Sequence, residues 1–418
     1  MKRNYYIVAL IMLTFFVISF LTNVIGPLEP DIAKDFNLSL ALASVLPFSF
    51  FIAYGVMSIP SGMLIKKYDE KRMMMVGFTV AFLGSLLLAL FPNYLTAIVS
   101  LFLMGSGFAM LQVVINPLLR TSGGEENYAF NSVLAQLIFG AASFLSPLVY
   151  SYMVLHLDDK KSLMSSFRSI IPASLPWISL YWLFAVISLL MIVIIFLSKF
   201  PKVELKKEEE AGPWKTHVML FKKRVVIAFF IGMICYVGTE QGISYWMSQF
   251  LATYHGYDPQ TTGAQEVAYF WGLMTAGGIV GLLLLKIMDS RKVLIGFTIL
   301  ALICITLGLF GSSKVALVAF PLSGFFASVM YPIIFSLALN SVSENHGSFS
   351  GIIVTGIIGG AIVQLIIGWI GSLFGLRTGM FFLYITMGYI LSIGIWARPI
   401  ITNKTIHLFG KKEKHNLS

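Results

Sequence analysis

A few polar residues lie alone inside long apolar stretches, and these are the residues with which the chain could do chemistry. Glu240 is the clearest case, with Gln241 and Ser244 beside it. A carboxyl group at bilayer depth costs about 2.5–3.5 kcal/mol on insertion scales, so it is rarely kept without a use. It could carry a proton or, with carbonyl and amide oxygens nearby, help to hold sodium. The alternative is a hydrogen-bonded structural Glu.

Neutral amides form a second set of candidates. Each amide side chain offers hydrogen-bond donors and acceptors together, which suits a neutral solute rich in hydroxyl groups. Two of them, Gln112 and Asn116, are four residues apart and share a helix face. The alternative role for all of them is helix-to-helix hydrogen bonding. The candidate amides are Gln112, Asn116, Gln136 and Gln364, and the candidate aromatic cavity residues are Tyr245, Trp246, Trp271 and Tyr331.

The composition indicates the class of protein in which these residues lie. Of the 418 residues, 57% are hydrophobic and only 11% are charged. A soluble domain usually carries about 25% charged residues, so this surface is not built to face water. The net charge of +10 comes from positive residues in short loops and at the ends, which favours membrane topology over nucleic-acid binding as its cause.

Twelve apolar runs are long enough to cross a bilayer, which takes about 20 residues per helix. They are too long and too uniformly apolar for the strands of a membrane barrel. The first run lacks a signal-peptide cleavage site, so we expect it to span as well. The expected spans are 5–27, 40–65, 72–91, 95–119, 128–154, 176–198, 224–252, 264–287, 292–311, 315–341, 348–374 and 378–399.

Lysine and arginine predict the orientation. With the N-terminus inside, 23 of the 29 Lys and Arg fall in inner segments, so we expect both termini to be cytoplasmic. Glu29 and Asp31 at the end of the first span, and Glu266 near the start of the eighth, are then expected at the outer surface. Trp177, Tyr181 and Trp182 are expected in the aromatic belt at the membrane surface.

The longest charged segment divides the chain into two halves with six helices each. We therefore predict an all-α membrane protein with an N-terminal six-helix bundle (1–198), a cytoplasmic linker (199–223), a C-terminal six-helix bundle (224–400) and a cytoplasmic tail (401–418). This plan suggests the major facilitator architecture. The alternative is an unrelated twelve-helix protein, such as a channel or a membrane-embedded transferase.

The loop after the second span resembles the major facilitator loop signature, a Gly followed by a basic and acidic cluster. Here the signature residues are Gly62, Asp69 and Arg72. Gly allows close helix contact, and an acid at a helix end can pair with a basic group or a dipole of the facing half. We therefore expect a gating role for the three residues. The loop 286–292 has the same character, which supports a repeat.

Five further segments, in order along the chain, resemble bacterial glucose/galactose permeases and the related fucose/proton symporters. Leu111–Pro117 is similar to their "LQVAANP" and Leu134–Gln136 to "LAQ". Tyr236–Glu240 is similar to "YVGAE", and Tyr331–Leu339 to "FPTIFSLAL". Ser350–Ile352, followed by Gly359–Ile362, is similar to "SGI…GGAI". The resemblance implies a sugar permease driven by protons or, in some relatives, by sodium.

The departures from that family are equally specific. The acidic position of its first helix is Gly26 here, with Asn23 and Glu29 about one turn away on either side. The Pro in its eleventh helix is replaced by Gln364. We list Glu240, Asn23 and Glu29 as candidate coupling residues, with a gating or structural role as the alternative for Glu29. The substrate and the coupling ion stay open, and so does uniport.

No GxSxG, HExxH, CxxC or GxxxxGK pattern is present in the sequence, so we expect no enzyme and no cofactor besides a coupling proton or sodium. The expectation is a monomeric, multi-pass protein of the cell membrane, in contact with lipid and without nucleic acid. It would import a small neutral sugar by cation symport, with helices 1, 4, 7 and 10 lining the site and helices 5, 8 and 11 contributing. The rivals are an exporter of drugs or lipid-like molecules, a sugar uniporter, and a non-transporting sensor or membrane enzyme.

Overall fold

The computed structural model describes residues 4–65, 68–124, 127–157, 159, 170–172, 174–201, 214–342 and 346–400, and the regular secondary structure of these residues is helical. Twelve helical segments in these ranges are long and apolar enough to cross a membrane, as predicted. A helix satisfies its backbone hydrogen bonds internally, which lipid requires. The chain is therefore a multi-pass membrane protein.

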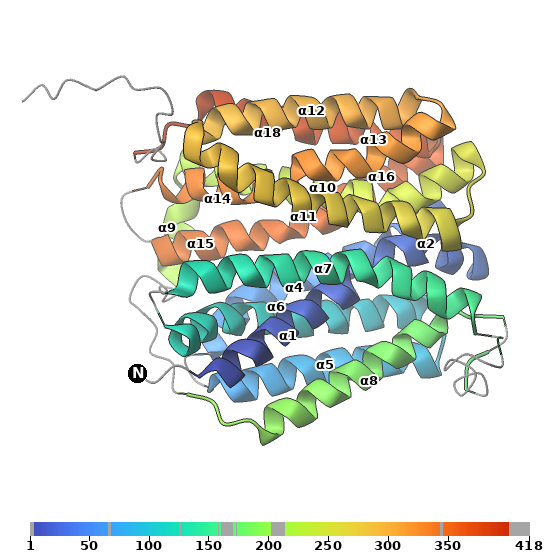
Figure 1. Cartoon of the computed structure of the whole chain (residues 1–418), viewed down its shortest axis with the longest axis horizontal. Coiled ribbons are helices and arrows are strands. Elements are labelled where there is room, and N and C mark those ends of the chain that lie inside the picture. The colour runs from blue at the N-terminus through green and yellow to red at the C-terminus, as the bar shows by residue number, and fades with distance from the viewer. Residues whose placement is uncertain are drawn as a thin grey trace, which may run out of the picture.

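The first six spans form one bundle, drawn blue to green in the lower half of Figure 1. Its elements are α1 (Tyr5–Thr22), α2 (Ile25–Asp35), α3 (Leu40–Ala43), α4 (Val45–Leu64), α5 (Glu70–Leu90), α6 (Tyr94–Gly123), α7 (Tyr128–Leu155) and α8 (Ile178–Leu197). Backbones approach closely where small residues meet. A Cβ on Gly107 of α6 would lie only 2.3 Å from the carbonyl oxygen of Gly77 in α5.

The last six spans form the second bundle, in the upper half of Figure 1. The short α9 (Trp214–Phe221) precedes it. Its elements are α10 (Arg224–His255), the π-helical η3 (Pro259–Gly263), α11 (Ala264–Ile287), α12 (Ser290–Phe310), α13 (Ser313–Ala327), α14 (Met330–Leu339), α15 (His346–Thr355), the 3₁₀-helical η4 (Gly356–Ile358), α16 (Gly359–Phe374), α17 (Leu376–Met380) and α18 (Phe382–Trp396). The residue numbers at which we divided the chain into bundles, linker and tail stay a prediction.

Several spans are interrupted rather than continuous. The first span, predicted as 5–27, runs from Tyr5 to Asp35 and breaks at Asn23 and Val24, where α1 ends and α2 begins. The tenth span breaks at Ser328 and Val329, between α13 and α14. Broken spans place backbone and polar groups at membrane depth, which is tolerated where protein surrounds them or where they line a cavity.

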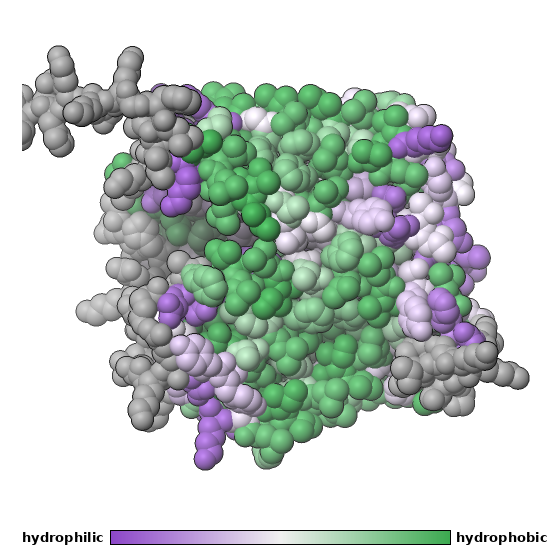
Figure 2. Space-filling view, in the orientation of Figure 1, coloured by the Kyte–Doolittle hydropathy of each residue, from purple (hydrophilic) through white to green (hydrophobic). Residues whose placement is uncertain are grey.

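The outer surface of the molecule matches its surroundings. Figure 2 shows a broad green apolar band over both bundles, with polar residues gathered at the two ends. We call the end that holds α2, η3 and the last turn of α16 the α2 end, and the opposite end, where Asn4 and α9 lie, the linker end (Figure 1). Between the bundles the surface recedes at the linker end.

Candidate functional site

The break in the first span presents one side chain in a fixed orientation. The amide nitrogen of Asn23 donates hydrogen bonds to Ser143 Oγ of α7 at 2.9 Å and to Ser19 Oγ at 3.3 Å. Ser19 and Ser143 in turn lie 2.6 Å apart and both donate to the carbonyl of Phe139. The other amide atom, Asn23 Oδ1, is buried and has no partner among the described residues. It is therefore available to accept a hydrogen bond from a ligand.

A second amide lies across from it, on the other bundle. Gln364 of α16 is completely buried, and neither its Oε1 nor its Nε2 has a hydrogen-bond partner among the described residues. A buried amide left without partners costs about 1–3 kcal/mol per group. This cost indicates that the amide is held for a ligand or water rather than for the packing of the helices.

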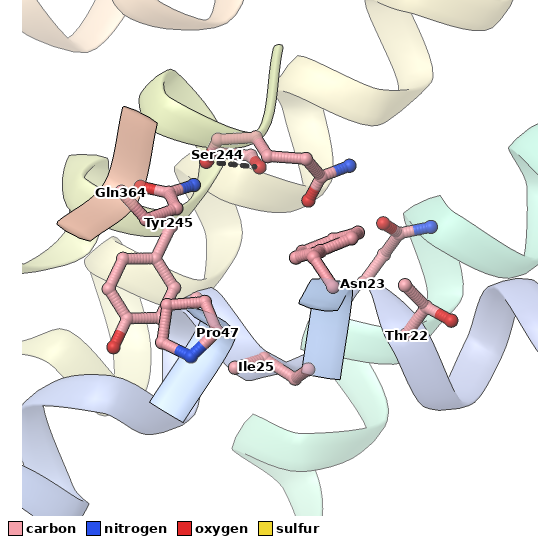
Figure 3. Close-up of a pocket in the computed structure, with 10 residues that line it drawn as sticks. Thr22, Asn23, Ile25, Pro47, Ser244, Tyr245 and Gln364 are labelled. Carbon is pink, nitrogen blue, oxygen red and sulfur yellow. Dashed lines mark hydrogen bonds between the residues drawn. The ribbon is translucent and has the colours of Figure 1, made fainter. Parts of the chain in front are cut away.

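These two amides, with residues of α10, surround a small cavity between the bundles (Figure 3). Ser244 and Tyr245 contribute from α10, and the Tyr245 hydroxyl donates to the carbonyl of Ala43 at 2.8 Å, so the ring forms a fixed wall. The free volume is about 10 Å³, enough for one water molecule. The lining residues are Thr22, Asn23, Ile25, Gly26, Pro47, Phe51, Gln241, Ser244, Tyr245 and Gln364.

Glu240 lies next to this cavity. It precedes Ser244 by four residues, which is about 6 Å along the axis of α10 toward the linker end. Gln241 Nε2 donates to Glu240 Oε1 at 3.2 Å, and the Tyr236 hydroxyl donates to the same carboxylate. The ring of Tyr331 on α14 lies 5.8 Å from the ring of Tyr236. The carboxylate thus has two uncharged donors and no ion pair among the described residues.

The cavity is closed on the side of the α2 end, where the bundles touch. A Cβ on Gly26 would lie 2.6 Å from the carbonyl oxygen of Ser244 and 3.0 Å from Tyr245 Cα, so the two backbones are in direct contact. Farther out, Gln260 Nε2 donates to both oxygens of Asp31, at 3.0 and 3.2 Å. Asp31 also accepts a hydrogen bond from Tyr150 of α7.

Two carboxyl groups that were expected at the outer surface are buried within the α2 end. Glu29 has no exposed surface, because α2 packs against α10 through Gly26, one turn away. Glu266 is 7% exposed, because the π-helical turn η3 precedes it and covers the start of α11. Both oxygens of Glu29, and Oε2 of Glu266, have no partner among the described residues.

The predicted aromatic belt at the start of α8 is also wrong in part. Trp177 and Tyr181 are each 1% exposed. The indole of Trp177 donates to Asp35 at 2.7 Å, and its ring meets that of Tyr181 edge-on. Trp177 is therefore held in the interior by its hydrogen bond to Asp35, which lies 142 residues away in the sequence. Trp182 is half-buried.

The other predicted binding residues lie outside this cavity. Trp246 and Trp271 are buried, and neither lines it. Gln112 is half-buried on α6, whereas Asn116 and Gln136 are exposed toward the linker end. The structure thus brings Asn23, Tyr245 and Gln364 together and leaves the amides of α6 and α7 apart from them. Their contact with substrate stays a prediction.

The loop residues expected to act in gating make local contacts. Gly62 makes no close helix contact, since a Cβ there would meet nothing within 4 Å. Asp69 caps the N-terminus of α5 by accepting from the backbone N–H of Arg72 at 2.8 Å, and pairs with the Arg72 side chain at 3.3 Å.

The equivalent loop of the second bundle repeats this arrangement. Asp289 caps α12 by accepting from the backbone N–H of Arg291 at 2.8 Å, and it pairs with the Arg291 side chain at 3.1 Å. The hydrogen bond from Arg291 holds the pKa of Asp289 below its usual range. The third span of each bundle, α5 or α12, therefore starts in the same way.

Sequence reasoning missed several residues of the site. Ser143 and Ser19 orient Asn23, but serine is common in membrane helices and gives no signal alone. Tyr236 could have been found, because it lies four residues before Glu240 on the same helix face. Among the described residues no group of three or more His, Cys, Asp or Glu is placed to hold a metal ion.

Comparisons with known proteins agree with this architecture. The model of the Major Facilitator Superfamily matches residues 11–357. A glucose/galactose transporter of Brucella abortus is 28% identical over 400 residues, 94% of this chain and 95% of the relative. A putative glucose/galactose transporter of Helicobacter pylori is 30% identical over 361 residues, covering 85% and 86%. The L-fucose-proton symporter of Escherichia coli is 26% identical over 395 residues, covering 90% and 89%.

Solved structures share the fold. The E. coli fucose:proton symporter in its outward conformation superposes with a TM-score of 0.66 at 23% identity, covering 94% of this chain and 98% of that one. An inward-facing bacterial homologue of the human lysosomal transporter Spinster gives 0.77 at 14% identity, covering 94% and 97%. With two six-helix bundles around a polar cavity, and a family model that spans most of its length, the chain belongs to the Major Facilitator Superfamily.

Proposed function

We propose that this protein is a secondary transporter that imports a small neutral sugar by cation symport, with the cavity of Figure 3 as part of its substrate site. The observation that carries the proposal is the pair of buried, unpartnered amides, Asn23 and Gln364, which face the cavity from opposite bundles. Amides match sugar hydroxyls because both groups donate and accept hydrogen bonds. The relatives named as glucose/galactose transporters and as a fucose-proton symporter support the choice of substrate class.

The cavity is smaller than a sugar in the present conformation. Its free volume of about 10 Å³ holds a single water molecule. A substrate therefore needs the bundles to separate, which is the basis of alternating access. We propose that they rock as two bodies, with the linker end on the cytoplasmic side. The Lys and Arg of the inner loops support this orientation.

Glu240 is the coupling group in this proposal. Its carboxyl group is adjacent to the cavity, and its donors are the neutral groups of Gln241 and Tyr236. Because no basic side chain holds it in an ion pair among the described residues, it is free to take up a proton or to contribute to a sodium site. Its position beside the substrate groups lets one ligand change the affinity for the other.

The test is uptake of a radiolabelled panel of neutral sugars into proteoliposomes, with and without an imposed proton or sodium gradient. Wild type should accumulate a sugar only with a gradient. Glu240→Gln should lose accumulation and keep exchange of that sugar across the membrane. Asp159→Asn, at an exposed position outside the spans, is the matched control and should behave as wild type.

Each failure has a distinct meaning. If no sugar enters under any gradient, the sugar assignment is wrong, and an exporter of drugs or lipid-like molecules becomes the leading alternative. Such an exporter would require a more apolar cavity than the one between Asn23 and Gln364. If a sugar equilibrates equally in wild type and Glu240→Gln, the protein is a uniporter and Glu240 is structural.

A further inference from the structure

Glu29 is a buried carboxyl group that the proposed transport cycle has not used. It lies on α2, one turn after Gly26, and therefore on the face that touches α10. Its side chain has no exposed surface, and neither carboxylate oxygen has a hydrogen-bond partner among the described residues. The hydroxyl of Tyr245 on α10, which Glu29 influences electrostatically, is directed to the carbonyl of Ala43 instead.

The charged groups around Glu29 do not stabilise an anion there. Helix α2 contacts α3, α7, α10, α11 and η3. Lys34 is exposed on α2 and makes no ion pair with Glu29, and α3 contributes no titratable side chain. Asp31 on α2 and Tyr245 on α10 interact electrostatically with Glu29, and the same elements and the residues beside them also carry Asp35, Tyr150, Asp258 and Glu266. An ionised carboxylate without a partner or water is far more costly to bury than the neutral acid.

Asp31, two residues away, shows the contrast. It accepts hydrogen bonds from Tyr150 of its own bundle and from Gln260 of the other, so its charge is compensated while the α2 end is closed. Glu29 has neither bond. Closure of the α2 end gives Asp31 its hydrogen bond from Gln260. The same closure removes water from Glu29 without supplying a hydrogen-bond donor.

We propose that Glu29 is a proton-binding gate residue: closure of the α2 end takes up one proton on its carboxylate, and opening returns that proton to the solution at the same end. The inference rests on the alternating access of the proposed function. Separation of α2 from α10 hydrates the carboxyl group, which then ionises. By linkage, protonation favours the closed end and deprotonation the open end. Because the proton enters and leaves on one side, Glu29 gates the carrier, and Glu240 remains the coupling group.

The glycine at position 26 fits this scheme. A Cβ at Gly26 would already collide with the backbone of Ser244 and Tyr245, so a longer acidic side chain has no room when the end is closed. Glu29 provides a carboxyl group on the same face of α2, one turn farther out. Closure can therefore bring the two backbones together and bury an acid in the same interface.

The test measures closure directly and needs no sugar. Spin labels are placed at Leu95 and Phe374, two exposed positions at the α2 end, one in each bundle, after Cys235 and Cys304 are replaced. Their distance distribution is recorded in nanodiscs between about pH 5 and about pH 9, on either side of ordinary carboxyl and imidazole titration. The ratio of open to closed molecules should rise with pH in wild type, by at most about tenfold per pH unit for one proton.

Three variants make the test specific. Glu29→Gln, which mimics the neutral acid, should stay closed across the range, while Glu29→Asp should keep a pH response. If Glu29→Gln does not fold, Glu29→Leu, which is also uncharged, takes its place and should likewise stay closed. Glu266→Gln removes the other buried carboxyl group of this end and should respond as wild type does.

The proposal is overturned if Glu29→Gln or Glu29→Leu follows the wild-type pH response, if wild type itself shows none, or if Glu266→Gln alone abolishes it. These outcomes are separate from the fate of the proposed function. A protein that transports no sugar in the uptake panel can still open with rising pH. A sugar symporter whose α2 end ignores pH would refute only the role of Glu29.

Discussion

Substitution of Gly26 by Ala should shift the carrier toward the open α2 end. The added Cβ would lie 2.6 Å from the carbonyl oxygen of Ser244 and 3.0 Å from Tyr245 Cα, and both are backbone atoms that cannot turn aside. Relief requires α2 to move away from α10 by several tenths of an ångström. Overpacking of this kind costs about 1–3 kcal/mol.

That cost applies only to the closed state. Gly26 and Ser244 belong to different bundles, so their collision disappears when the bundles separate at this end. The open-to-closed ratio should therefore rise by about 5- to 150-fold. The melting temperature is a poor readout, because Ala stabilises a helix relative to Gly by about 1 kcal/mol. This gain can mask the stability that the collision removes from the closed state.

The distance between spin labels at Leu95 and Phe374 measures the shift. Gly388→Ala in α18 is the matched control, since a Cβ there would meet nothing within 4 Å. Gly26→Ala should populate the longer distance at a fixed pH, and the control should not. If the two variants have the same distance distribution, direct backbone contact between α2 and α10 does not hold this end closed.

Two further substitutions test contacts of opposite kinds. Gln260→Leu removes both hydrogen bonds from Gln260 to Asp31, each worth about 1.5–3 kcal/mol for a charged acceptor. The spin labels at Leu95 and Phe374 should therefore report opening of the α2 end. An unchanged distance distribution would mean that water replaces the amide at no cost. Lys71→Met removes the ammonium that donates to the carbonyl of Ser198 at 2.8 Å at the end of α8, so the melting temperature should fall by a few degrees while transport per folded molecule is kept. The exposed Lys222→Met is its control, and equal melting temperatures for the two would contradict a stabilising role of Lys71.

The arrangement of spans could be predicted because the bilayer imposes a simple rule. Each crossing needs about 20 apolar residues in a helix, so the twelve runs are visible in the sequence. The break inside the first span was not predicted, since Thr22 to Gly26 is as apolar as its surroundings apart from Asn23. A helix end at membrane depth is decided by the groups around it, here the serines of α1 and α7 that hold the Asn23 amide.

The site was predictable only where chemistry shows in a single residue type. Gln364 stood out as an amide in an apolar run, and Asn23 as a polar residue one turn from Gly26; both line the cavity. The environment of a carboxyl group could not be predicted, because it depends on distant segments. Glu29 and Asp31 are two residues apart, yet one is completely buried without partners and the other is held by Tyr150 and Gln260. No local pattern separates them.

The contacts of the signature loops lie within a bundle, whereas other contacts join the two bundles. Asp69 and Asp289 each cap their own helix, and Lys71 ties α5 to the end of α8, so the charges of the signature loop join helices of one bundle. At the α2 end the bundles meet through close contacts at glycines, Gly26 against Ser244 and Gly368 against Leu40, and through hydrogen bonds such as that from Gln260 to Asp31. When this end opens, the hydrogen bonds are exchanged for hydrogen bonds to water, at a cost of about 1.5–3 kcal/mol where the acceptor is charged. In the proposed alternating access, the free energy that separates the open from the closed α2 end depends on these interface groups, and Glu29 is a buried one whose charge a proton can change.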